Sequence, residues 1–461
     1  MEKNQQFTFI CYHCTSRSWK NRDDNRNNFS IIWQIPNFNS YECWGRCDTK
    51  ANGEEKISSD RFKVETIASF CIRWCNAYFK TSQINLSLSP SDRKYYDQFY
   101  IGAKILFQNE WAGNILKLTY SRVIVDEYQD CTLKHHAIIK ELEKYLQVIV
   151  LGDPLQGIFS FKDPLVDWSN LGYPIIKVET SPWRWEKTNK ALGEYLTILR
   201  DQLLPTLSGV RCSISIVNNP NISVIHSQSF DIYKMLPDLQ NFSSVIYVTK
   251  WANKQLEFCK RMGGLFQNDE KQECDELFKY AEFFDNNVGC KLALSVLYFA
   301  HECATKVSTE LKSYIENLKK DKYNFSRITK HKNIGNKIEV LCGTSDLDSL
   351  YELLSCFKDS SDFRMYRKEL FSEMLRSIKY ALDHSVSVFE AANHIRKDVH
   401  LQKRYTQFKF LSTRTLLSKG LEFDCVIIDM SDGLNAKEFY VAMTRAMKRI
   451  YIISNTSHLS F

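Results

Sequence analysis

Short apolar runs and an amphipathic stretch alternate in the first half of the chain. Residues 122–130 (RVIVDEYQD) and 147–159 (QVIVLGDPLQGIF) each begin with an apolar run and end in acidic or glycine-containing positions. Between them, residues 134–146 (KHHAIIKELEKYL) space apolar side chains three and four positions apart, which is typical of a helix. Strand, helix and strand in this order predict a parallel βαβ unit with a right-handed crossover.

A second group of apolar runs lies on either side of a long helical region. Predicted strands occupy 243–250 (SSVIYVTK), 407–413 (QFKFLST), 424–430 (DCVIIDM) and 449–455 (RIYIISN), and a predicted helix occupies 439–448 (FYVAMTRAMK). Residues 255–400 are largely helical in their spacing. The pattern therefore predicts two α/β portions that flank a helical insertion.

The N-terminal residues show a weaker pattern. Residues 7–12 (FTFICY) predict one strand, and helical spacing begins at 64–80 (VETIASFCIRWCNAYFK). Residues 83–118 are mixed and predict a small helical insertion, whereas residues 15–60 match no pattern.

Composition sets the class of protein. At roughly 150 residues per domain, 461 residues predict two or three domains, and 44% hydrophobic with 25% charged residues is typical of a globular protein. No apolar run reaches the ~18 residues of a membrane span, and no secretory signal is visible, so we expect a cytoplasmic protein with reduced cysteines. The net charge of +7 permits a polyanionic partner without indicating one.

Asp126 and Glu127 end a predicted buried strand, where ligands of parallel sheets bind. An aspartate at such a position can hold Mg²⁺, and the neighbouring glutamate can activate a water molecule that attacks a bound nucleotide. The alternative is that the two carboxylates are solvated turn residues.

The surrounding segments resemble a known family. DEYQD at 126–130, LGDPLQGIF at 151–159, TLLSKGLEFD at 415–424 and YVAMTRAMKRIYI at 440–452 are similar to motifs II, III, V and VI of the UvrD/Rep-type superfamily 1 DNA helicases. VETIASF at 64–70 is similar to the Ib segment of that family. The order and separation of these blocks match the family pattern.

The resemblance implies an α/β fold with two RecA-like P-loop NTPase lobes, parallel sheets and a mainly helical inserted domain. Lobe 1A would span 1–200, with its small helical insertion near 75–118. Lobe 2A would combine 205–255 with 400–461, and the 2B-like insertion would span 256–399. The implied cofactors are ATP and Mg²⁺.

The resemblance also implies roles for residues at the nucleotide. Asp126 would hold the magnesium ion, Glu127 would activate water, Gln156 would sense the γ-phosphate, and Arg445 would be an arginine finger. For Arg445, the alternative is a surface arginine on an amphipathic helix.

Three further residues are implied at the nucleotide. Arg184 in SPWRWEKTN lies where the family has motif IV, although the local sequence departs from the family pattern and its tryptophans suggest core packing as an alternative. Gly420 and Glu422 of KGLEF would approach the nucleotide, with Glu422 accepting a hydrogen bond from the ribose.

DNA contacts follow from the same resemblance. Phe159 and Phe161 lie where family members carry aromatic side chains that stack on bases of single-stranded DNA, and core packing is their alternative role. Thr66 and Thr415 would contact phosphates. The implied partner is single-stranded DNA or a junction of single and double strands, with translocation from 3′ to 5′ by analogy.

The first family motif, the P-loop GxxxxGK[ST], is absent from the 461 residues, and none of the 16 glycines is followed by lysine. Residues 7–14 resemble the motif Ia strand, which in the family follows the P-loop helix, so either a truncated or a specialised N-terminus is expected. The alternative function is a pseudo-helicase that binds DNA or a partner, such as a nuclease subunit of a repair or anti-phage complex.

Three weaker features have simple interpretations. Cys11, Cys14, Cys43 and Cys47 are spaced imperfectly for a zinc site, and we favour ordinary thiols. His135 and His136 are expected at the solvated edge of a helix. The lysine-rich stretch 318–332 is either a contact for duplex DNA phosphates or a solvated helix end.

Overall fold

The computed structural model describes a defined part of the chain: residues 30–34, 62–88, 92, 94–158, 164–174, 182–216, 219–269, 275–358, 360–401 and 408–461. The strand expected at 7–12 lies outside these residues. Contacts divide the chain into two compact units: the first comprises Met1–Leu88, Asp92–Lys250 and Thr415–Phe461, and the second comprises Ser89–Ser91 and Trp251–Arg414.

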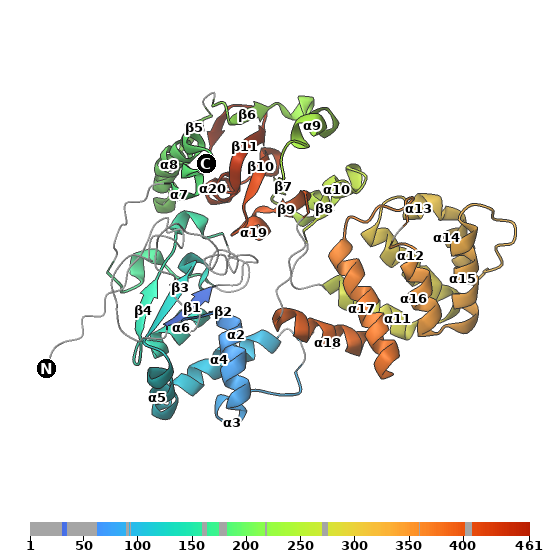
Figure 1. The fold of residues 1–461 in the computed structure, drawn as a ribbon, viewed down its shortest axis with the longest axis horizontal. Coiled ribbons are helices and arrows are strands. Elements are labelled where there is room, and N and C mark those ends of the chain that lie inside the picture. Colours follow the sequence, from blue (N-terminus) through green and yellow to red (C-terminus); the bar gives the residue numbers. More distant parts are fainter. Residues whose placement is uncertain are drawn as a thin grey trace. The chain divides into compact units, whose positions relative to one another are not determined.

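The first sheet of unit 1 is parallel and has the strand order β2-β1-β3-β4 (Figure 1). Its strands are β1 (Ser30–Gln34), β2 (Phe62–Thr66), β3 (Arg122–Asp126) and β4 (Gln147–Val150). The predicted βαβ unit is confirmed as β3, helix α6 (Leu133–Leu142) and β4. Val123 and Val125 are fully buried, as the alternation of a strand requires.

The helical spacing predicted from residue 64 begins too early. Residues 62–66 form β2, and helix α2 (Ile67–Ala77) starts after Thr66, whose Oγ1 accepts a hydrogen bond from the Ser69 amide. Strand β1, which pairs with both β2 and β3, explains the difference, because these ladder bonds come from residues distant in sequence.

The helices beside this sheet bury an aromatic core. They are α2, α3 (Phe79–Ser82), α4 (Tyr95–Phe107), α5 (Glu110–Thr119) and α6. Phe70, Trp74 and Phe107 lie within 6 Å of one another, measured between ring centroids. Each is at most 5% exposed, so α4 of the small helical insertion packs against α2 through these rings.

The expectation for the two adjacent histidines was wrong. His135 is 8% exposed, and its Nδ1 accepts a hydrogen bond from the amide of Thr132, the residue that caps α6. His136 Nδ1 lies 2.5 Å from the Tyr128 hydroxyl. Both rings are engaged because the first turn of α6 packs against the loop that follows β3.

The second sheet has six strands in the order β6-β11-β10-β7-β9-β8. Its strands are β6 (Ile222–Ile225), β7 (Val245–Thr249), β8 (Gln267–Asn268), β9 (Phe410–Arg414), β10 (Phe423–Asp429) and β11 (Ala446–Ile453). The first four in the spatial order lie in unit 1, where β10 pairs in parallel with both β7 and β11. Strands β5 (Ser213–Ser215) and β12 (His458–Ser460) form a separate antiparallel pair.

The other described helices of unit 1 are α7 (Trp183–Glu186), α8 (Lys190–Leu203), α9 (Ile232–Leu239), α19 (Thr415–Ser418) and α20 (Ala436–Met443). The helix predicted over 439–448 is too long, since α20 ends at Met443 and β11 begins at Ala446. The β-branched run in RIYII pairs with the central strand β10, which overrides the helical spacing of the preceding residues.

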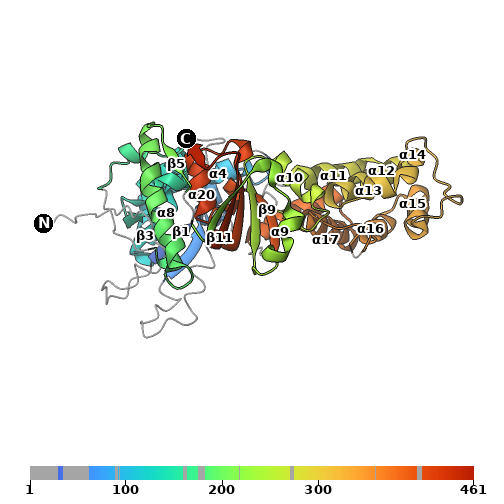
Figure 2. The ribbon, with the colours of Figure 1, turned by 90° about the horizontal axis from the view of Figure 1, so that it is seen from above.

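Unit 2 confirms that the segment 255–400 is largely helical. Its helices are α10 (Ala252–Arg261), α11 (Asp275–Asn286), α12 (Gly289–Cys303), α13 (Val307–Glu310), α14 (Lys312–Leu318), α15 (Lys332–Thr344), α16 (Leu347–Ser355), α17 (Lys368–His384) and α18 (Val388–Leu401). Figure 2 shows α11 and α12 in one layer with α16 and α17 in another. One continuous apolar core joins α11 to α18.

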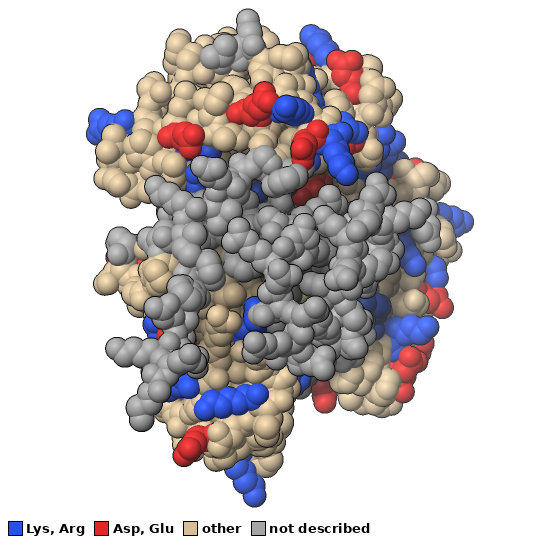
Figure 3. Space-filling model, turned by 60° about the vertical axis from the view of Figure 1, so that its left-hand side comes forward, with Lys and Arg blue, Asp and Glu red and all other residues tan. Residues whose placement is uncertain are grey.

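The predicted α/β class, with two parallel sheets and a mainly helical insertion, is confirmed. None of the described helices combines the length and the apolar character needed to cross a membrane. On the face drawn in Figure 3, the visible basic and acidic side chains of the described residues are interspersed.

Candidate functional site

The carboxylates of DEYQD lie on a tight loop after β3. Asp126 ends the strand, and its Oδ1 accepts a hydrogen bond from the Glu127 amide at 2.9 Å. Glu127 has the left-handed backbone conformation, with φ 55° and ψ 39°, which costs a non-glycine residue roughly 1 kcal/mol. The Tyr128 amide then donates to the Leu151 carbonyl at 2.8 Å. The loop after β3 is therefore fixed to the loop after β4.

Gln129 connects the same two loops through its side chain. Its Nε2 donates to Glu127 Oε2 at 2.5 Å, and its Oε1 accepts from the Asp153 amide at 2.9 Å. A Cβ atom at Gly152 would lie 2.3 Å from Gln129 Oε1, so the glycine is required for this approach. Gln129 is 2% exposed and orients the Glu127 carboxylate, although the family resemblance implied no role for it.

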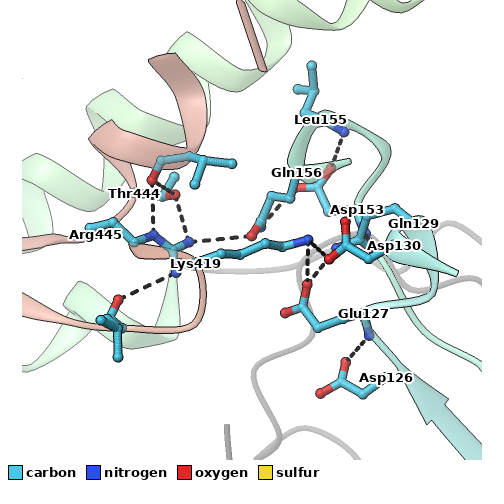
Figure 4. Close-up of polar contacts among 12 residues, drawn as sticks. Asp126, Glu127, Gln129, Asp130, Asp153, Leu155, Gln156, Lys419, Thr444 and Arg445 are labelled. Atoms are coloured by element: carbon cyan, nitrogen blue, oxygen red, sulfur yellow. Dashed lines mark hydrogen bonds and ion pairs between the residues drawn. The ribbon is translucent and has the colours of Figure 1, made fainter. Parts of the chain in front are cut away.

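Lys419 brings a positive charge to these carboxylates. This residue follows α19, is fully buried, and places its Nζ 3.2 Å from Glu127 Oε2 while forming a second ion pair with Asp130 (Figure 4). It begins the KGLEF segment, of which only Gly420 and Glu422 were candidates from the sequence. The sequence feature that could have identified Lys419 is its position in this motif, directly before Gly420.

The pKa values of the two carboxylates are shifted in opposite directions, although the Lys419 ammonium lowers both. Burial raises the pKa of Glu127, but the Lys419 ammonium, Arg445 and the Gln129 amide together hold that pKa below its ordinary value. Burial raises the pKa of Asp130 to about 7 despite Lys419, and the charge of Glu127 adds to the increase. Glu127 is therefore the ionised carboxylate at neutral pH, whereas Asp130 titrates there.

Arg445 lies in the turn between α20 and β11 and is 2% exposed, so it is not a surface residue on a helix. Its guanidinium donates to the Val441 carbonyl at 2.9 Å and, more weakly, to the Leu421 carbonyl at 3.4 Å. Nη2 donates to Gln156 Oε1 at 3.4 Å. Burial and the nearby Arg184 lower the pKa of Arg445 to about 10, which leaves it a cation at neutral pH.

Arg184 and Glu422 form an ion pair beside Arg445. Arg184 Nε lies 2.9 Å from Glu422 Oε1, and Nη1 donates to the Thr444 carbonyl at 2.9 Å. Trp185 is buried, and its indole donates to the Ala446 carbonyl at 2.6 Å. Helix α7 is thus attached to the turn that carries Arg445.

The remaining predicted residues lie in several places. Gly420 has φ 80°, a conformation that favours glycine. Thr415 is 2% exposed, and Thr66 caps α2. Phe159 and Phe161 lie outside the described residues, as do the four cysteines Cys11, Cys14, Cys43 and Cys47.

The described residues contain no group of three or more His, Cys, Asp or Glu side chains that could hold a metal ion by itself. A magnesium site does not require such a group, because Mg²⁺ usually takes one or two carboxylates from the protein and its remaining oxygens from phosphates and water. Asp126, the residue predicted to hold the ion, is the last residue of β3.

The titration of Asp130 should make folding depend on pH. Its pKa in the folded protein, about 7, is above its ordinary value of 3.8, so folding favours the protonated form. The stabilisation from this group is complete below its ordinary pKa and is lost as pH rises through about 7. We expect the free energy of unfolding of the Asp130→Asn variant to change less between about pH 5 and pH 8 than that of the unaltered chain, measured with urea. Equal changes in the two proteins would contradict the assignment.

Comparison with known proteins gives one family match. The model of the UvrD/REP helicase N-terminal domain matches residues 96–168. Among solved structures, the Pif1 helicase from Candida albicans matches over 94% of this chain and 92% of its own, with 11% sequence identity and a TM-score of 0.29. No curated protein matches the chain. The segment that is similar to the UvrD/REP helicase N-terminal domain, residues 96–168, carries Asp126, Glu127 and Gln156.

Proposed function

We propose that this chain is an ATP-dependent DNA helicase or translocase that acts on single-stranded DNA and moves from 3′ to 5′. The observation that carries the proposal is the contact between Gln156 and Arg445, at 3.4 Å, beside the ion pair of Lys419 with Glu127. These contacts bring the loops after β3 and β4 together with the two C-terminal motif segments. A nucleotide bound there would contact residues of the loops after β3 and β4 and residues of the two C-terminal motif segments.

Each residue has a role that suits its geometry. Glu127 is ionised and oriented by Gln129, so it can accept a proton from an attacking water molecule. Arg445 and Arg184 are cations that can neutralise charge developing on phosphoryl oxygens. Gln156 would contact the γ-phosphate, and its hydrogen bond with Arg445 would couple that contact to the arginine. Glu422 would accept a hydrogen bond from the ribose. Mg²⁺, held by Asp126, would supply charge neutralisation when it is bound.

Nucleic-acid contact would come from Thr66, Thr415, Phe159 and Phe161. In the proposed division, lobe 1A spans 1–200, lobe 2A combines 205–255 with 400–461, and residues 256–399 are the insertion. Closure of the two lobes on ATP would shift the phosphate contacts and move the protein along one strand. Stacking on aromatic rings tolerates any base, so no sequence preference is expected.

A second function is favoured by one observation. The 461 residues contain no Gly-Lys pair, so the lysine of a P-loop is not among them. Without that lysine and its loop, the triphosphate would have fewer donors, and hydrolysis would be weak. The chain would then be a pseudo-helicase that binds single strands or a partner, such as a nuclease subunit in a repair or anti-phage complex.

One experiment separates the two functions. ATP hydrolysis by the purified full chain is measured with and without oligo-dT, and with EDTA as the control for the magnesium requirement. We expect hydrolysis that oligo-dT stimulates and EDTA abolishes. Single-strand binding without hydrolysis would support the pseudo-helicase, and neither activity would contradict both functions.

A further inference from the structure

The loop between α14 and α15 in unit 2 carries an exposed group of positive charges. Among residues 319–332, six lysines and arginines are exposed and the only acidic residue is Asp321. The exposed cations are Lys319, Lys320, Lys322, Arg327, Lys330 and Lys332. Of these, Lys330 is paired with Glu310. Tyr323, 47% exposed, lies among them.

This loop is held in place rather than being a loose connection. Phe325 is 5% exposed and packs edge-on against Tyr314, with ring centroids 4.9 Å apart. The Phe325 amide donates to Glu339 Oε1 at 2.5 Å, and the Tyr314 hydroxyl donates to the Lys330 carbonyl at 2.7 Å. The backbone that carries the cations is therefore ordered before any ligand binds, which lowers the cost of binding.

A cavity of about 370 Å³ lies where the loop begins and is lined from α12, α13 and α14. It is lined by Tyr298, His301, Ser308, Lys312, Ile315, Glu316 and Lys319. Lys319 both lines the cavity and starts the loop, so the two features adjoin at this residue. We term the cavity and the basic loop together the α14 surface.

The walls of this cavity suit an aromatic base next to a phosphate. Tyr298 is 38% exposed, so its ring is accessible. Burial, together with Lys260, lowers the pKa of His301, which makes its imidazole a neutral ring at neutral pH. The charge of Glu316 is offset by Lys312, which lies 3.8 Å away. Lys319 therefore gives the rim of the cavity a net positive charge.

We propose that the α14 surface binds single-stranded nucleic acid, with phosphates along the basic loop and one base in the cavity against Tyr298. Exposed cations with interleaved aromatic rings are the usual means of holding single strands without regard to sequence. A duplex offers phosphates but no free base face for the cavity. All of these residues lie in unit 2, so the inference does not require ATP hydrolysis at the site in unit 1.

The charge of the loop is tested with the Lys320→Glu/Lys322→Glu variant of the full chain. Its matched control is Lys358→Glu/Lys379→Glu, which changes the charge equally at exposed lysines elsewhere in unit 2. For labelled oligo-dT and oligo-U, we expect the loop variant to bind about tenfold more weakly. The slope of log affinity against log salt should shrink by about 1.4, at roughly 0.7 for each phosphate that the variant no longer neutralises. The control should bind like the unaltered chain.

The base site is tested with Tyr298→Ala and Tyr298→Phe. The alanine variant should lose at least about fivefold in affinity for single strands, whereas phenylalanine keeps the ring and should bind normally. A loss with only one of the two oligomers would identify DNA or RNA as the ligand.

Unchanged single-strand binding in both the loop and alanine variants would overturn the proposal, as would losses seen only with blunt duplex. If the unaltered chain bound no single strand, this inference and the proposed function would fail together. If the losses occurred in a chain that does not hydrolyse ATP, only the proposed hydrolysis would fail.

Discussion

In the Glu127→Gln variant, ATP hydrolysis stimulated by single-stranded DNA is expected to fall by about 10²- to 10⁴-fold. Lys419, Arg445 and Gln129 hold the pKa of Glu127 below its ordinary value, so the carboxylate is ionised and can accept a proton at neutral pH. The amide of glutamine has the same shape but cannot accept that proton. Its oxygen can still accept hydrogen bonds from Gln129 Nε2 and Lys419 Nζ, so the loop should keep its conformation.

The measurement is the steady-state rate of phosphate release with saturating oligo-dT. Glu194→Gln is the matched control, because Glu194 is an exposed glutamate of α8 in the same unit, 3.8 Å from Lys190. The control should hydrolyse ATP at the normal rate, and both variants should bind oligo-dT normally. If Glu127→Gln retained the full rate, Glu127 would not be the residue that activates water.

The strands that were predicted correctly are those marked by a local pattern in the sequence. The strands β3, β4, β7 and β10 were predicted because each is a short apolar run, and such a run is visible in the sequence. Strand β1 was not predicted, since its place between β2 and β3 depends on pairing with residues distant in sequence. The early end of α20 has the same cause, because the pairing of β11 with β10 determines where the strand begins.

For the candidate site, motifs indicated which segments matter, but not which side chains meet. Arg445 and Gln156 were identified, and the structure places them 3.4 Å apart. Lys419 and Gln129 lay inside the same motifs and received no role, because a lysine in a loop is usually solvated and only tertiary packing shows that this one is buried. The pairing of His136 with Tyr128 is likewise a contact between turns that spacing alone does not reveal.

The Lys419→Met variant is expected to lose about 3–5 kcal/mol of unfolding free energy at about pH 8, because it leaves the buried Asp130 carboxylate without its countercharge. The loss should be smaller near pH 5, where the raised pKa of Asp130, about 7, leaves this group protonated and uncharged. Asp130 Oδ1 has no hydrogen-bond partner among the described residues, which leaves room for that proton. Urea unfolding at the two pH values measures both effects.

A double-variant cycle separates the ion pair from simple loss of packing. Lys419→Met combined with Asp130→Asn removes both charges, so it should be more stable at pH 8 than Lys419→Met alone. The control is Lys187→Met, since Lys187 is exposed in the same unit and makes no ion pair within the described part of the chain, and it should cost much less. If Lys419→Met were as stable as the unaltered chain at both pH values, the ammonium would not lie between the two carboxylates in solution. In that case the route by which the KGLEF segment lowers the pKa of Glu127 would be lost, and the case for Glu127 as the ionised base would rest on Arg445 and Gln129 alone.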